Sequence, residues 1–87
     1  MIRIVYGSRF LKSARLLPKA QQHKLAFLLT ILKGDPFDKR LHVKRLAGEL
    51  AGLHSFRITR DWRVMYQFLD AETVQLLYAV HRKDVYR

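Results

Sequence analysis

The fold of this sequence is decided by its last third, HSFRITRDWRVMYQFLDAETVQLLYAVHRKDVYR, residues 54–87. Apolar residues alternate with polar or charged ones in three runs, His54–Thr59, Arg63–Leu69 and Thr73–His81. A period of two is typical of β-strands with one buried face. Because only a few residues separate the runs, the three strands are predicted to form an antiparallel meander.

The N-terminal part predicts one strand and two helices. Alternation indicates a strand over Ile2–Tyr6, and Ser8 is placed to cap a helix that runs to Leu17. A second apolar stripe begins at Pro18 and continues to about Lys33, before Gly34 and Asp35-Pro36 end the helix. The order is β-α-α-β-β-β. It predicts a single α+β domain over residues 1–87, in which a helical hairpin packs on a mainly antiparallel sheet.

The connection between the helices and the meander, residues 37–53, has no clear period. Its segment LAGELAGL looks like a small repeat. Gly48 and Gly52 are better explained as turn residues that lead into the next strand.

The chain is strongly basic, with a net charge of +10, and no acidic residue precedes Asp35. Such a field attracts nucleic acid and anionic ligands. For lysines on the helices, a solvated surface is the simpler explanation. For arginines on strands we expect contact with phosphate, because the planar guanidinium binds two oxygens at once.

The sequence contains no cysteine, so neither a disulfide nor a thiolate metal site is expected. The four histidines lack the spacing of metal ligands, and no carboxylates cluster with them, so we expect no metal. His23 and His42 are expected to be structural or solvated, and His54 is a lesser candidate for chemistry. No apolar segment approaches membrane-spanning length, and a cytoplasmic protein is expected.

The meander should present one face to the helices and the other to solvent. Phe56, Val64, Tyr66 and the alternate residues of the last strand, Leu76, Tyr78 and Val80, are predicted to face the helices. On the other face, Arg57, Arg63 and His81 are expected to converge. That face also carries Met65, Leu77 and Ala79, which would form an apolar floor for a base or a peptide. A solvated sheet face is the alternative.

Three segments carry a resemblance to a known family. They are Arg57-Ile58, Arg63-Val64-Met65-Tyr66 and the run HRKDVY, residues 81–86. With the strand and helical hairpin before them, they resemble the RelE/ParE superfamily of toxins from bacterial and archaeal toxin–antitoxin pairs. The RelE branch cleaves messenger RNA in the ribosomal A site without a metal, whereas the ParE branch poisons DNA gyrase.

The resemblance implies a site and its partners. Arg63 matches the central-strand arginine of RelE-type toxins, Arg57 a preceding basic position, Arg82 the C-terminal arginine and Tyr86 the C-terminal tyrosine. The segment before Tyr86 is shorter than in the best-known relatives, so Lys83 is an alternative to Arg82. The implied partners are a cognate antitoxin, messenger RNA and the ribosome, with no small-molecule cofactor. The antitoxin is expected to be acidic and partly disordered until it binds, over the basic face or along the helices.

Metal-free RNA cleavage needs a base for the ribose 2′-hydroxyl, an acid for the leaving oxygen and cations for the phosphorane. Arg63 and Arg82 suit the cationic role. Family resemblance favours Tyr86 as the base, whereas intrinsic pKa favours His81. Tyr86 is taken as the base, with His81 as the acid or as an alternative base. Further contacts with RNA are expected from Lys44, Arg45, Arg57, Arg60 and Lys83. A gyrase inhibitor of the same fold and a non-catalytic RNA-binding module are the alternatives.

Overall fold

The structure is a computed structural model, and it describes residues 1–85. The chain begins with one strand and two α-helices: β1 (Arg3–Tyr6), α1 (Ser8–Arg15) and α2 (Lys19–Gly34). The connection to the meander contains η1 (Lys39–Leu41), β2 (Lys44–Arg45) and η2 (Gly48–Leu50). The remaining elements are β3 (His54–Arg57), β4 (Trp62–Asp70), β5 (Thr73–His81) and η3 (Arg82–Asp84).

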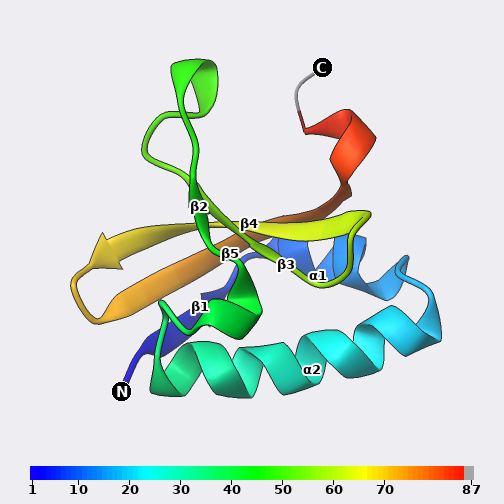
Figure 1. Ribbon diagram of the computed structural model, residues 1–87, viewed down its shortest axis with the longest axis horizontal. Coiled ribbons are helices and arrows are strands. Elements are labelled where there is room, and N and C mark those ends of the chain that lie inside the picture. Colours follow the sequence, from blue (N-terminus) through cyan, green and yellow to red (C-terminus); the bar gives the residue numbers. More distant parts are fainter. Residues whose placement is uncertain (86–87) are drawn as a thin grey trace.

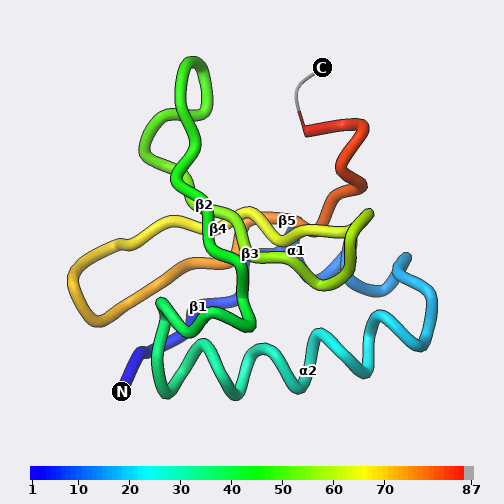
Figure 2. The backbone as a smooth tube through the Cα atoms, in the orientation of Figure 1, coloured from blue at the N-terminus to red at the C-terminus, as the bar shows by residue number. Residues whose placement is uncertain are grey.

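The strands form one five-stranded sheet in the order β1-β5-β4-β3-β2. β1 pairs with β5 in parallel, and every other pair is antiparallel. α2 covers one side of the sheet, while the segments that contain η2 and η3 rise from the opposite side (Figure 1). The tube in Figure 2 shows that the chain between β2 and β3 climbs away from the sheet and returns to it. We call the side opposite α2 the open face.

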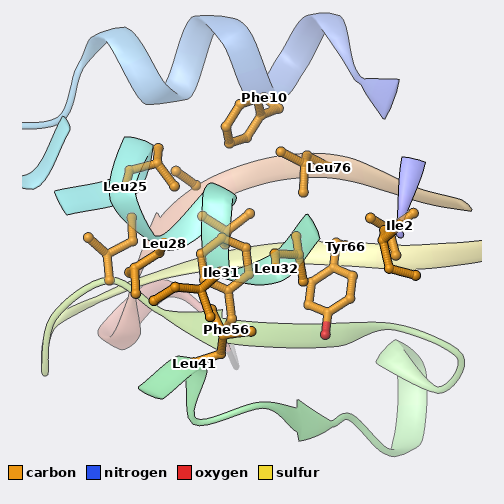
Figure 3. Close-up of a cluster of buried hydrophobic side chains, with 14 of the residues drawn as sticks. Ile2, Phe10, Leu25, Leu28, Ile31, Leu32, Leu41, Phe56, Tyr66 and Leu76 are labelled. Atoms are coloured by element: carbon orange, nitrogen blue, oxygen red, sulfur yellow. The ribbon is translucent and has the colours of Figure 1, made fainter. Parts of the chain in front are cut away.

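The core lies between α2 and the sheet. Side chains from both helices, η1 and the strands meet there, as Figure 3 shows for Phe10, Leu32, Leu41, Phe56 and Leu76. Leu32, Leu41 and Phe56 have no exposed surface. Burial of such side chains stabilises a fold by about 1.5–3 kcal/mol each, which makes this layer the main source of stability.

The predicted α+β class and antiparallel meander are confirmed. One short strand was missed, and one capping prediction was wrong. β2 was not predicted, because two cationic residues show no alternation. Ser8 does not cap α1: it is the first helical residue, and Gly7 occupies the cap position without a side-chain hydrogen bond. Gly48 and Gly52 do lie at turns, with φ of 64° and 92°.

A β-bulge in β5 changes which residues face the core. Met65 pairs with Tyr78, but the next residue of β4, Tyr66, pairs with Leu76, so Leu77 is the extra residue. After the bulge the alternation is reversed: Ala79 pairs with Val64 and lies in the core. The expectation that Tyr78 and Val80 pack in the core under the helices was therefore wrong, as was the placement of Ala79 on the open face.

α1 continues the edge of the sheet where β1 ends. Gly7 donates a backbone hydrogen bond to the Leu76 carbonyl (3.0 Å), and the Ala79 amide donates to the Ser13 hydroxyl of α1 (2.8 Å). The helix thus satisfies a backbone donor that an unpaired edge strand would leave to water. The close approach of residue 7 to the backbone of β5 requires glycine, because a Cβ on Gly7 would lie 2.7 Å from the Leu76 oxygen.

Gly7→Ala is expected to destabilise the protein by about 1–3 kcal/mol, because the clash is with backbone that cannot move without shifting β5. Chemical denaturation of the purified variant measures the change. Gly34→Ala, at the end of α2, is the control. Apart from its chain neighbours and the backbone of its own helix, no atom lies within 4 Å of the added Cβ, so stability should be equal or higher. Equal stability of Gly7→Ala and the unmodified protein would contradict the role given to Gly7.

Candidate nucleic-acid interface

Three basic residues of the sheet, Arg57, Arg63 and Lys44, lie close together on the open face. Arg57 of β3 lies directly opposite Arg63 of β4, and Lys44 of β2 lies opposite Ser55 of β3. Since Arg57 and Ser55 are two residues apart on one strand, all four side chains project from the same side of the sheet. The predicted convergence of Arg57 and Arg63 is confirmed, and Lys44 joins them.

These residues line a pocket of about 250 Å³. Its walls combine the cations with residues from the segment that leads into β2, and none of them is acidic. The lining residues are His42, Val43, Lys44, Ser55, Arg57 and Arg63. We call this the arginine pocket. Its composition suits an anion, because the described lining contains the three cations Lys44, Arg57 and Arg63 and no carboxylate.

The arrangement is unfavourable for the isolated protein. Like charges directly opposite one another on paired strands repel, at a cost of a few tenths to about 1 kcal/mol. Moreover, the Nε atom of Arg63 is buried and has no hydrogen-bond partner among residues 1–85. A buried donor without a partner also costs free energy. A bound phosphate would supply both the opposite charge and the missing acceptor.

Several predicted contacts lie elsewhere. Arg45 pairs with His54 and so projects to the side opposite Lys44. Arg60 lies in the turn between β3 and β4, and Lys83 lies in η3; both are exposed and neither lines the arginine pocket. Met65 was expected to form part of an apolar floor for a base or a peptide, but it has no exposed surface and a ligand cannot reach it.

Because of the bulge, His81 and Arg63 project to opposite sides of the sheet. It pairs with Trp62, and the two rings meet edge to face with centroids 5.1 Å apart. Trp62 packs against the core, so His81 lies on the helix side of the sheet while Arg63 pairs with Val80 on the open face. The expected convergence of His81 with Arg57 and Arg63 was therefore wrong. Its Nδ1 accepts a hydrogen bond from the Lys83 amide (3.3 Å) and so helps to start η3.

Arg82 follows directly after β5 and is fixed by the turn before β4. Its Nε lies 3.3 Å from a carboxylate oxygen of Asp61, and its amide donates to the Asp61 carbonyl (2.7 Å). Both side chains are about half exposed, so the ion pair is screened and weak. Tyr86, the other C-terminal candidate, lies outside the described residues.

Three residues of the arginine pocket were not predicted as site residues: His42, Val43 and Ser55. His42 has a left-handed backbone, with φ of 49°, which turns the chain from η1 into β2 and brings it to the pocket. Ser55 is almost fully buried between the cationic positions. Alternation along β3 places Ser55 on the same face as Arg57. The sequence carries no signal for His42 and Val43, because their place depends on β2, whose pairing is visible only in three dimensions.

His54 and Tyr66 form a separate, partly polar cluster on the helix side. The His54 ring lies 5.6 Å from that of Tyr66 and meets Phe68 edge to face at 5.2 Å. Neither His54 Nδ1 nor Tyr66 Oη has a partner among the described residues. Burial raises the pKa of Tyr66 to about 12, and burial together with the charge of Arg45 lowers the pKa of His54.

The fold of this chain, two helices on a five-stranded and mostly antiparallel sheet, is also that of solved RelE-type toxin structures. YafQ from E. coli strain BL21(DE3) is 20% identical, with a TM-score of 0.80 over 100% of both chains. A chain of the toxin–antitoxin complex RelBE2 from Mycobacterium tuberculosis is 26% identical, with a TM-score of 0.75 over 93% of this chain and 98% of that one. A chain of the archaeal RelE–RelB complex from Pyrococcus horikoshii OT3 is 24% identical, with a TM-score of 0.77 over 95% and 97%.

The fold that the sequence resemblance implied, that of the RelE/ParE toxins, is thereby confirmed. No protein-family model and no curated protein matches the sequence itself.

Within residues 1–85, no group of three or more metal-ligating side chains comes together. No helix in the described part of the chain has the length and hydropathy needed to cross a membrane.

Inorganic phosphate is expected to stabilise the protein against unfolding, because it offsets the repulsion between Arg57 and Arg63. Arg57→Gln should raise stability without phosphate, by up to about 1 kcal/mol, and should reduce the gain on adding phosphate. Chemical denaturation at constant ionic strength, with phosphate or chloride, measures both effects. Arg3→Gln, on the far edge strand, should keep the phosphate response. An unchanged response in Arg57→Gln would show that phosphate binds elsewhere.

The free energy of unfolding is expected to decrease in mild acid because of His54. Its pKa is lowered in the folded protein, so unfolding takes up a proton. The contribution of neutral His54 to the free energy of unfolding is complete well above the ordinary pKa of 6.5. It is lost as the pH falls through 6.5 toward the lower pKa of the folded state. His54→Phe should show a smaller loss of unfolding free energy between neutral and mildly acidic pH than the unmodified protein. His23→Ala, at an exposed position of α2, should not. Equal pH dependence in His54→Phe would refute the assignment.

Proposed function

We propose that this protein is the toxin of a toxin–antitoxin pair and that it cleaves messenger RNA on the ribosome by attack of a ribose 2′-hydroxyl on the adjacent phosphate. The observation that supports the proposal is the arginine pocket, in which Arg57 and Arg63 face each other without a carboxylate. The RelE-type fold supports it as well. A solvated basic surface would not require two arginines opposite each other or a buried, unpartnered Nε.

In this proposal Arg57 and Arg63 bind the scissile phosphate and stabilise the charge that develops in the phosphorane. Arginine suits the task, because it stays protonated and offers two parallel N–H groups. Lys44 and His42 close the pocket from the side of β2 and hold the neighbouring phosphate or ribose. The segments of η2 and η3, which rise on the same side as the pocket (Figure 1), would flank the bound strand.

Proton transfer is assigned to the C-terminal segment. Tyr86 is the proposed general base, as the family resemblance implies. We propose His81 as a positioning residue, because its Nδ1 is engaged by the Lys83 amide and its ring packs on Trp62. Arg82 is proposed to approach the phosphate from η3, with its guanidinium oriented by Asp61.

The partner that this function requires is a cognate antitoxin. The RelBE2 and RelE–RelB structures are complexes of that kind, as is the DinJ–YafQ complex of E. coli, which shares the fold with a TM-score of 0.79. Neither α1 nor α2 contains an acidic residue, and the arginine pocket has none, so the antitoxin is expected to present carboxylates.

Arg63→Ala should lower the rate of messenger RNA cleavage on purified ribosomes by about a hundredfold or more, because one donor to the transition-state charge is lost. Primer extension on translated messages measures the cleavage, and growth of expressing cells gives a second readout. Arg3→Ala, an exposed arginine outside the pocket, is the matched control and should cut normally. Unchanged cleavage by Arg63→Ala would exclude this site. Intact RNA together with broken DNA would replace the nuclease by a gyrase poison.

A further inference from the structure

Tyr78 lies on the open face beside the arginine pocket, a position that simple alternation does not predict. The bulge at Leu77 places Tyr78 opposite Met65, and Val80 opposite Arg63. Tyr78 and Arg63 are therefore diagonal neighbours on paired strands, a relation in which side chains lie about 7–8 Å apart and long ones meet.

Arg9 of α1 reaches the same place from the other side. Its guanidinium carbon lies 4.3 Å from the centre of the Tyr78 ring, within the range of a cation–π interaction. The hydrogen bond from the Ala79 amide to Ser13 fixes α1 against β5 one residue further along, so the contact is built on two rigid elements. Arg9 is exposed, whereas Tyr78 is partly buried beneath it.

We propose that Arg9 and Tyr78 form a stacking site for a nucleobase, next to the phosphate bound by Arg57 and Arg63. The inference rests on the proposed function, in that it takes single-stranded RNA as the ligand. A guanidinium plane that covers an aromatic ring presents a flat outer surface, and unpaired bases stack on such planes. The diagonal relation of Tyr78 to Arg63 lets one nucleotide place its phosphate in the arginine pocket and a base on Arg9.

The site would recognise the presence of a base rather than its identity. Stacking needs only a π-face, so every base is accepted, with purines favoured by their larger area. A role for Arg9 that is only structural, pinning α1 to β5, would be served by any cation over the ring. Lysine is a compact charge without a plane, so Arg9→Lys separates the two roles.

The test compares two oligonucleotides with the same number of phosphates: a short 2′-O-methyl RNA and its abasic counterpart. Neither can be cut by 2′-hydroxyl attack, so binding is measured without cleavage. The unmodified protein should bind the base-bearing strand about tenfold more tightly, as stacking of one base implies. Arg9→Lys should lose this preference while it binds the abasic strand as before. Tyr78→Phe should keep the preference, because stacking does not use the hydroxyl.

Arg3→Lys is the matched control and should behave as the unmodified protein. A preference that survives in Arg9→Lys, equal binding of the two strands by the unmodified protein, or no binding of either would overturn the proposal. The nuclease proposal fails separately: a clear preference for bases together with intact RNA on ribosomes would leave the stacking site and remove the cleavage.

Discussion

The pairing of β4 with β5 is the constraint on which the rest of the molecule depends. These are the two longest strands, they occupy the middle of the sheet, and each carries residues for both the core and the open face. One extra residue in β5, Leu77, determines which side chains of β5 lie on the same side of the sheet as Arg63 and which lie in the core. Because of it, Ala79 closes the core next to Val64, while Val80 and Tyr78 join Arg63 on the other side. Core packing and the arrangement of the basic residues are thus fixed by the same bulge.

The arginine pocket lowers the stability of the free protein. Arg57 and Arg63 repel each other, and Arg63 keeps a buried Nε without a described partner. The core under α2 supplies the stability that tolerates this, since its side chains are almost completely buried. If an anion binds there as proposed, relief of the repulsion that exists in the free protein would contribute to the binding free energy.

Much of this architecture could be predicted from the sequence. The alternation in residues 54–81 and the apolar stripes of the two helices predicted the α+β class, the meander and the placement of Arg57 and Arg63 on one face. The position of His81 could not be predicted, because a bulge leaves no mark in a pattern of period two until the partner strand is known. The same holds for β2 and His42, whose contribution depends on an edge pairing of only two residues.

Both borders of the sheet are built so that they do not recruit another strand. On one side β1 is short, and α1 takes over the exposed stretch of β5 by offering the Ser13 hydroxyl to a main-chain amide. On the other side β2 consists of a lysine and an arginine, which repel an identical copy. A protein with a charge of +10 and such borders is protected from edge-to-edge aggregation while it is still without a partner. The same positive charge attracts ligands that carry negative charge.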